Sequence, residues 1–265
     1  MDIRRCAIGV FDSGIGGLTV LAALRRRLPG EDLVYLGDTA RVPYGTRSRQ
    51  VIIRYAQNNA RFLSGFDLKM LVVACNTVSA VALPELEQAL PVKVLGVVEP
   101  GAQAAALLRP RHVGVIGTAG TIRSGAYQAA LARLVPDAKV SATACPLFVP
   151  LAEEGWTDGD VPTQVARRYL ASLAGVDTLV LGCTHYPILR QAIATAMGPE
   201  VRLVDSAAAT AEAAAAWLEA ERSGNDASKP GGERLFVTDL GDAFGAVAER
   251  FLGRPVQAPE LVDIS

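Results

Sequence analysis

Two cysteines occupy matched positions in the chain and could act as a pair of acid–base groups. Cys75 and Cys183 each end an apolar run, and each is followed by two hydrogen-bonding residues, Asn76-Thr77 and Thr184-His185. A short apolar run bounded by a turn signal is typical of a buried strand in a parallel sheet. Ligands bind at the carboxyl ends of such strands. We therefore predict one site with a thiol on each side, which removes a proton from one face of a small molecule and returns a proton to the other face.

Such a site differs in geometry from a redox pair. Two thiols that serve one carbon should place their sulfurs roughly 6–8 Å apart, because each sulfur must approach that carbon to about 3–3.5 Å. The sulfurs of a redox pair would close to about 2 Å when oxidised. Cys75 and Cys183 are 108 residues apart and are flanked by polar residues, which argues against a thiol redox protein. Cys6 and Cys145 lack that context and are interpreted as structural.

Neighbouring groups decide how readily a thiol becomes the reactive thiolate. A strand end that leads into a helix N-terminus stabilises the thiolate, and so does a nearby cation. His185 lies two residues after Cys183 and is one of 2 histidines in the chain. The other, His112, follows Arg111 just before an expected strand and is interpreted as a surface residue. The sequence thus indicates His185 as the partner of the second thiol.

A glycine-rich turn follows the first expected strand, residues 7–11. The turn Asp12-Ser13-Gly14-Ile15-Gly16-Gly17 precedes an expected helix over residues 18–28, so backbone N–H groups at the helix start could hold an anion. The spacing is not that of the dinucleotide motif GxGxxG, and the charge of Asp12 would repel a pyrophosphate. The alternative is a tight turn capped by Asp12 or Ser13. A second turn, Pro43-Tyr44-Gly45, brings an aromatic hydroxyl and an unhindered backbone N–H onto a loop.

The composition disfavours several classes of protein. Half of the 265 residues are hydrophobic and the net charge is -1, so nothing indicates binding to nucleic acid or to a membrane. The four lysines do not lie beside a phosphate cradle, which argues against a pyridoxal phosphate enzyme. No CxxC pair or Cys/His cluster indicates a metal. The 4 cysteines are expected to be free thiols in a reducing cytoplasm.

Three pairs of segments repeat along the chain. Residues 8–11 match 113–116, Cys75 matches Cys183, and 94–98 match 201–205, at offsets of 105, 108 and 107 residues. Matches in this order indicate two similar halves. Each half follows the order of a doubly wound, flavodoxin-like α/β fold with a parallel sheet. We predict two such domains, related by a pseudo-twofold axis, with the site in the cleft between them.

Several other elements are expected from local patterns. Helices are predicted over residues 79–90, bent near a proline, and over 102–108, after a strand over 92–98. Residues 148–155 are predicted to be a loop or short helix that carries two carboxylates. The polar stretch 223–232 is a predicted loop. It is followed by a predicted strand over 234–238, a helix over 242–252 and a tail that could add an extended segment.

The motifs together resemble those of glutamate racemases, cofactor-independent enzymes that make D-glutamate for bacterial cell walls. The matching stretches are residues 11–17, 37–45, 74–77, 145–151 and 182–187. They extend over most of the chain, from residue 8 to about residue 206, and as a set they are highly specific. The match is looser after Gly224, apart from residues 236–240.

The resemblance implies roles for individual residues. Cys75 would take the α-proton of the D-isomer and Cys183 that of the L-isomer. Asp12 would assist Cys75, His185 would assist Cys183, and Glu153 would be a further catalytic carboxylate. The substrate contacts that the resemblance implies are Asp12, Ser13, Tyr44, Gly45, Asn76, Thr77, Thr118, Thr121, Thr184 and His185.

The resemblance also bears on domains and partners. It implies a first α/β domain over residues 1–98 plus 207–265 and a second, inserted domain over residues 99–206. It implies a homodimer that binds glutamate and uses neither cofactor nor metal. A racemase of the same fold that acts on aspartate, or an isomerase of another small diacid, stays open, because the residues alone do not define the side-chain pocket. A binding module for amino acids with inert cysteines stays open as well.

Overall fold

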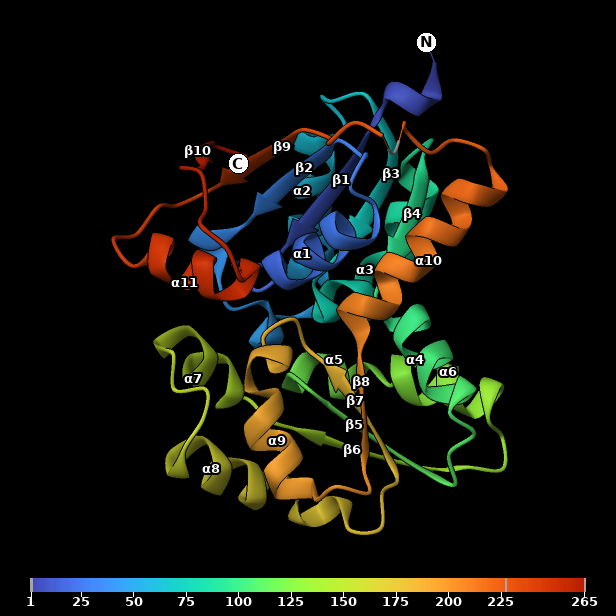
Figure 1. The fold of residues 1–265 in the computed structure, drawn as a ribbon, viewed down its shortest axis with the longest axis vertical. Helices are drawn as coiled ribbons and strands as arrows, with labels where there is room; N and C mark the ends of the chain where they lie inside the picture. The colour runs from blue at the N-terminus through green and yellow to red at the C-terminus, as the bar shows by residue number, and fades with distance from the viewer. Residues whose placement is uncertain (1, 227, 265) are drawn as a thin grey trace.

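The fold consists of two parallel β-sheets, one above the other along the long axis of the molecule (Figure 1). The computed structural model describes residues 2–226 and 228–264. The larger sheet has the strand order β10-β9-β2-β1-β3-β4, and the smaller sheet has the order β6-β5-β7-β8. The strands are β1 (Ala7–Asp12), β2 (Leu33–Gly37), β3 (Leu68–Val73), β4 (Lys93–Gly96), β5 (His112–Gly117), β6 (Lys139–Ala144), β7 (Thr178–Gly182), β8 (Arg202–Asp205), β9 (Glu233–Val237) and β10 (Glu260–Leu261).

The internal repeat is visible in the strand order. The order β2-β1-β3-β4 in the larger sheet corresponds to β6-β5-β7-β8 in the smaller one, and the described pairings of both sheets are parallel. Cys75 follows β3 and Cys183 follows β7, the corresponding strands of the two sheets. The predicted fold, two doubly wound α/β halves with parallel sheets, is therefore confirmed.

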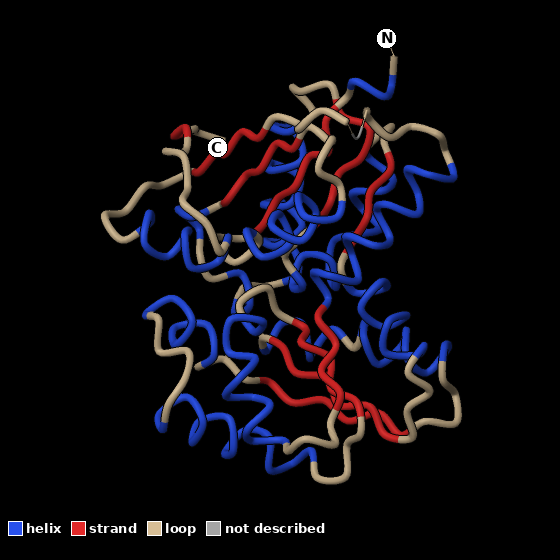
Figure 2. Tube along the Cα trace, in the orientation of Figure 1, coloured by secondary structure: helices blue, strands red, loops and turns tan. Residues whose placement is uncertain are grey.

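Helices cover both faces of the larger sheet (Figure 2). Side chains alternate across a strand, so Ile8 and Val10 pack with α1, α10 and α11, whereas Phe11 packs with α2 and α3 on the opposite face. The helices are α1 (Leu18–Arg27), α2 (Arg49–Leu63), α3 (Asn76–Ala89), α4 (Val98–Leu107), α5 (Ala119–Ser124), α6 (Ala126–Leu134), α7 (Phe148–Glu154), α8 (Asp160–Leu170), α9 (Arg190–Met197), α10 (Ser206–Ala220) and α11 (Phe244–Leu252).

Two helices begin earlier than the sequence predicted. α3 begins at Asn76 instead of residue 79, because Cys75 has extended backbone angles and occupies the N-cap position. α4 begins at Val98, so the predicted strand over 92–98 ends at Gly96 instead. Pro100 is accommodated in the first turn of α4, where a backbone N–H has no partner within the helix. Both shifts bring a helix N-terminus directly to the end of a strand.

The later elements return to the larger sheet. The chain leaves this sheet through β4 and α4 and re-enters it through α10, which packs against both α1 and α4. β9 pairs with β2 and the extended tail pairs with β9 as β10. The predicted tail segment is therefore present. The domain limits at residues 98 and 206 stay a prediction; the helices α4 and α10 begin at Val98 and Ser206.

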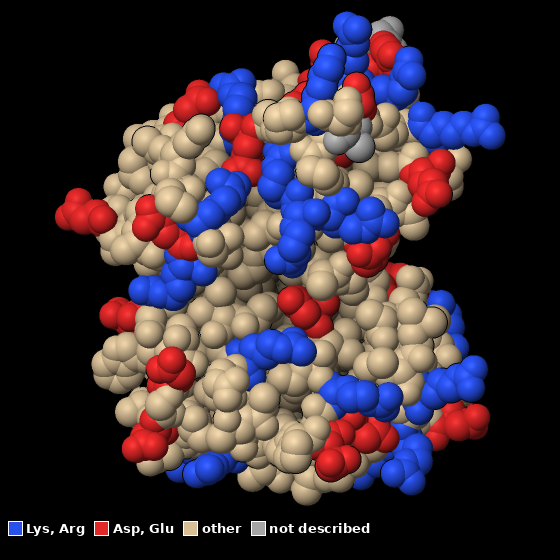
Figure 3. Space-filling view, viewed as in Figure 1, with Lys and Arg blue, Asp and Glu red and all other residues tan. Residues whose placement is uncertain are grey.

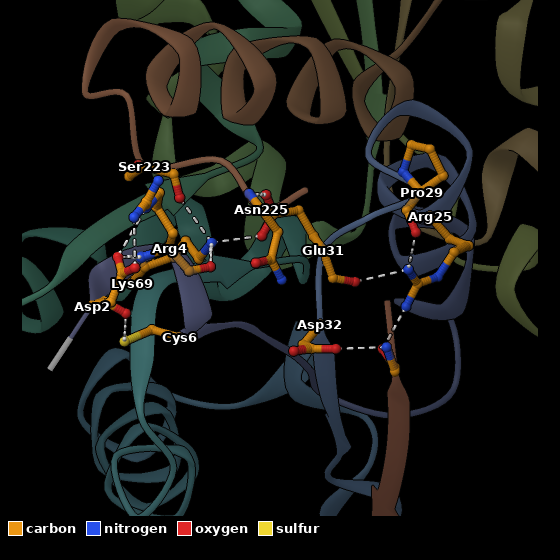
Figure 4. A network of polar contacts seen from close by, with 11 residues as sticks. Asp2, Arg4, Cys6, Arg25, Pro29, Glu31, Asp32, Lys69, Ser223 and Asn225 are labelled. Carbon is orange, nitrogen blue, oxygen red and sulfur yellow. Dashed lines mark hydrogen bonds and ion pairs between the residues drawn. The ribbon is translucent and has the colours of Figure 1, made fainter. Parts of the chain in front are cut away.

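A buried ion pair lies at the amino-terminal ends of the strands of the larger sheet (Figure 4). Lys69, in β3, is 2.7 Å from the Glu31 carboxylate and also donates to the carbonyl oxygens of Arg4 and Ser223 at 2.8 and 2.9 Å. The second carboxylate oxygen of Glu31 accepts from the N–H of Asn225 at 2.6 Å. Four separate segments therefore meet at one ammonium group, at the end of β3 opposite to Cys75.

Charges of both signs are interspersed on the face of the molecule drawn in Figure 3, in keeping with the net charge of -1. None of the helices among residues 2–226 and 228–264 combines the length and apolar character needed to cross a membrane.

Candidate active site

A cavity of about 370 Å³ lies between the two halves of the molecule. It is at the carboxyl ends of β1, β3, β5 and β7, where the parallel topology predicts a ligand site. Both cysteine side chains contribute to its wall, and each residue is only 5% exposed. All four cysteines are free thiols. The predicted residues that line the cavity are Ser13, Tyr44, Gly45, Cys75, Asn76, Thr77, Thr118, Glu153, Cys183, Thr184 and His185.

The first thiol lies beside a buried carboxyl group. The Cys75 sulfur donates to the Ser13 hydroxyl at 3.2 Å. Burial raises the pKa of Cys75 to about 12, and the charge of Asp12 raises it as well, while the bond to Ser13 opposes both effects. One oxygen of Asp12 accepts from the Gly14 N–H at 3.0 Å, and the other is buried without a partner. Cys75 is therefore a protonated thiol at neutral pH.

The second thiol lies beside an imidazolium. Burial acts to lower the pKa of His185, but hydrogen bonds to Cys183 and Glu153 outweigh it and raise this pKa to about 10. The imidazole Nδ1 is 3.9 Å from the Cys183 sulfur, and Nε2 is 2.9 Å from a carboxylate oxygen of Glu153. A cation at this distance favours the thiolate form of a cysteine. The two walls of the cavity thus differ: a thiol beside a carboxyl group on one side, and a sulfur 3.9 Å from an imidazolium on the other.

Three threonine hydroxyls form a cluster that joins the halves. Thr77 is at the start of α3, and Thr118 caps α5 by accepting from the N–H of Thr121. The hydroxyl oxygen of Thr77 is 2.9 Å from that of Thr118 and 3.3 Å from that of Thr121. Thr77 and Thr118 line the cavity, whereas Thr121 is fully buried behind them. The first two can meet a ligand, and Thr121 supports them.

The amide of Asn76 is oriented by a residue that the sequence did not reveal. The Tyr127 hydroxyl, from α6, donates to the side-chain oxygen of Asn76 at 2.7 Å. The amide nitrogen of Asn76 is buried without a partner, and the residue lines the cavity. The Asn76 amide nitrogen is therefore an N–H donor without a partner, on a residue of the cavity wall. Tyr127 lies inside a helix whose local pattern indicates only packing, so the sequence carries no signal for this contact.

Besides Thr121, two further predicted contacts are placed differently from what the sequence led us to expect. Asp12 is only 1% exposed and lies behind the cavity wall. It acts on the site through its electrostatic interactions with Cys75 and His185. The Tyr44 hydroxyl, expected to face a ligand, donates instead to Asp38 and accepts from Asn59. Tyr44 still lines the cavity. The aromatic hydroxyl of the Pro-Tyr-Gly turn thus forms its hydrogen bonds with protein side chains.

Other lining residues were not singled out from the sequence. Six of them lie within the quoted motifs, and position in a motif was the only signal for them: Gly14, Val42, Pro43, Pro146, Val149 and Pro150. Thr46 and Ala119 also line the cavity and lie outside the quoted motifs, directly after Gly45 and Thr118. No group of three or more His, Cys, Asp or Glu residues is arranged to hold a metal ion among the residues that the structure describes.

Known proteins resemble this chain in sequence and structure. A family model described as Asp/Glu/Hydantoin racemase matches residues 13–214. The glutamate racemase of Geobacter metallireducens is 55% identical over 250 residues, which cover 93% of each chain. A structure of the Francisella tularensis glutamate racemase in complex with D-glutamate has a TM-score of 0.92 at 38% identity and covers 98% of each chain. An aspartate racemase of Picrophilus torridus, at 15% identity and a TM-score of 0.57, shares the fold.

The matched region contains both cysteines and every other residue that lines the cavity, because the lining runs from Ser13 to His185. The chain therefore belongs to the Asp/Glu/Hydantoin racemase family, as the resemblance of its motifs predicted.

Proposed function

We propose that this protein interconverts L-glutamate and D-glutamate by a two-base proton transfer without a cofactor, with Cys75 and Cys183 as the bases. The observation that carries the proposal is that two cysteine side chains in one cavity have neighbours of opposite charge. Cys75, beside Asp12, is a thiol, whereas Cys183 lies next to the His185 imidazolium. Inversion in one passage needs one base and one acid at the same time, on opposite faces of the carbon.

The proton balance of the reaction follows from this arrangement. In the L-to-D direction the Cys183 thiolate removes the α-proton, so the Cα–H bond breaks, its electron pair stays on carbon, and an S–H bond forms. The Cys75 thiol then gives its proton to the opposite face, which forms the new Cα–H bond and leaves a thiolate. The D-to-L reaction starts from that second state. A single base would return the proton to the face it came from.

The carbanion between these steps needs stabilisation. Hydrogen-bond donors aimed at the developing oxyanion supply it best where water is excluded. The donors on the cavity wall are the amide nitrogen of Asn76 and the hydroxyls of Ser13, Thr77 and Thr118. The low exposure of the cysteines indicates that little water would remain around a bound substrate. We infer that these groups hold the α-carboxylate.

The choice of glutamate over aspartate is supported by the relatives. Those at 45–55% identity are named glutamate racemases, whereas an aspartate racemase homologue and an aspartate racemase of known structure are 14% and 15% identical. We further propose that the protein is a cytoplasmic homodimer and that it supplies D-glutamate for peptidoglycan. These parts of the proposal rest on the family resemblance. The expected sulfur separation of roughly 6–8 Å stays a prediction.

An isotope experiment tests the proposal. The protein is incubated with L-glutamate in deuterated water, with no added cofactor, and optical rotation and α-deuterium are followed. Loss of rotation together with label uptake is the expected result. Cys75→Ala and Cys183→Ala should each abolish racemisation, while Cys6→Ala, outside the cavity, should retain it. Binding of glutamate without exchange would support a binding module, and faster exchange of L-aspartate than of L-glutamate would support an aspartate racemase. Wild-type rates in both cavity variants would contradict the mechanism.

A further inference from the structure

A helix from the carboxyl-terminal segment contacts the opposite half of the molecule beside the active site. Figure 1 shows α11, in red, directly above α7 of the smaller-sheet half. The Arg250 guanidinium, on α11, donates from one nitrogen to the carbonyl oxygens of Ala152 and Glu153 in α7, at 3.3 and 2.7 Å. The contact therefore joins the two halves at the last turn of α7.

Arg250 supplies the carboxyl end of α7 with hydrogen-bond donors and with a positive charge. The last carbonyl groups of a helix have no partner within the helix and carry a partial negative charge. α7 is capped at its carboxyl end by Gly155, which adopts the left-handed conformation with φ of 79°. A side chain at this position would place its Cβ 2.6 Å from an Arg250 nitrogen. The guanidinium thus occupies the space beside Gly155 and supplies both the hydrogen bonds and the charge.

The end of α7 also carries the carboxylate that faces His185. The Glu153 side chain is 44% exposed, so water competes for it, and an exposed ion pair gains little by itself. Its 2.9 Å contact with His185 therefore depends on where the backbone of α7 is held. The next residue of α11, Phe251, packs its ring edge-on against His185, with 5.1 Å between the ring centroids. Consecutive residues of α11 thus contact both partners of the pair.

We propose that Arg250 is a positioning residue, which fixes the end of α7 so that the Glu153 carboxylate stays bonded to His185. The inference rests on the proposed function, in which His185 serves Cys183, but it concerns a contact that can be measured without turnover. The charged and titratable groups that face His185 are Cys183, Glu153 and Asp12. Arg250 bonds to the backbone behind Glu153 and acts on His185 only through it.

An NMR titration tests this proposal directly. The chain has 2 histidines, so the imidazole resonances are easily assigned and His112 serves as an internal reference. Arg250→Ala should lower the pKa of His185, as Glu153→Gln should, and Arg250→Lys should restore part of the shift. Arg254→Ala is the matched control, because Arg254 pairs with Glu233 and not with α7. An unchanged titration of His185 in Arg250→Ala would overturn the proposal.

A double-mutant cycle on activity provides the second readout. Misplacement of a catalytic group by about 1 Å can cost on the order of a hundredfold, so Arg250→Ala should lower kcat/KM roughly ten- to hundredfold and move the alkaline limb of the pH profile to lower pH. The double variant with Glu153→Gln should be no slower than Glu153→Gln alone, since both changes remove one contact. Effects that multiply would contradict the proposal. Absence of racemisation in the unmodified protein would contradict the proposed function instead. The NMR titration would still decide whether Arg250 positions Glu153.

Discussion

Gly16 provides a sharp test of how the two halves align the second thiol. This glycine belongs to the turn after β1, and its Cα faces the opposite half. A Cβ at this position would lie 2.4 Å from Nδ1 of His185 and 2.3 Å from the Thr184 hydroxyl oxygen, whereas ordinary contacts of a Cβ begin near 3.4 Å. In Gly16→Ala the imidazole and the turn must therefore separate by about 1 Å.

The expected loss of activity follows from that displacement. Nδ1 of His185 is 3.9 Å from the Cys183 sulfur, and a further 1 Å would break the contact. A misplacement of about 1 Å can cost on the order of a hundredfold in rate, or about 3 kcal/mol of transition-state stabilisation. Because the two enantiomers have equal free energy in water, kcat/KM should fall by the same factor in both directions. Initial rates of optical rotation from each isomer measure this.

A matched glycine variant separates the contact from a general effect on folding. Gly245→Ala, in α11, adds a methyl group where no atom lies within 4 Å, so its activity should equal that of the unmodified protein. Urea unfolding and near-ultraviolet circular dichroism would check that Gly16→Ala keeps its fold. If folded Gly16→Ala retained wild-type kcat/KM, the proposed alignment of His185 against the turn would be refuted.

Three further outcomes are expected. Tyr127→Phe removes the bond that orients Asn76 and should raise KM for glutamate more than it lowers kcat, in steady-state rates. The stabilising contribution of His185, measured against His185→Gln by urea unfolding, should be complete below pH 6.5, decline as the pH rises and vanish near pH 10, because its pKa is raised on folding. Lys69→Met leaves Glu31 buried without its partner and should cost about 3–5 kcal/mol of unfolding free energy, with unchanged kcat/KM for the folded protein.

The sequence predicted which residues come together where local pattern determines their position. Apolar runs that end in Cys75 and Cys183 indicate parallel strands, and the topology of such sheets brings their carboxyl ends to one edge. The residues next to these strand ends, such as Ser13 and Thr118, therefore line the same cavity. The repeat added the pairing of the two halves, which no single motif could supply.

Contacts made only by packing between the halves were not predictable. Tyr127 and Arg250 lie inside helices whose patterns indicate an apolar face and a polar face, and nothing local distinguishes them from neighbours. The Tyr44 hydroxyl is a converse case, in which a residue expected from its turn lines the cavity while its hydroxyl bonds elsewhere. A turn can show that a polar group is present, but the direction of the group depends on Asp38, six residues earlier, which competes for it.

The repeat explains why there are two thiols, and departures from the repeat explain why they differ. At an offset of 105 residues, Asp12 at the end of β1 corresponds to Gly117 at the end of β5; at an offset of 108, His185 corresponds to Thr77. Each half therefore carries one ionisable group that its counterpart lacks, an acid in one and a base in the other. Identical halves would leave both thiols in the same protonation state, and two thiols or two thiolates could not remove and return a proton in one passage. In the proposed mechanism the opposite charges near Cys75 and Cys183 remove this difficulty, and Asp12 and His185 also attract each other, so the difference between the two sides involves the whole site.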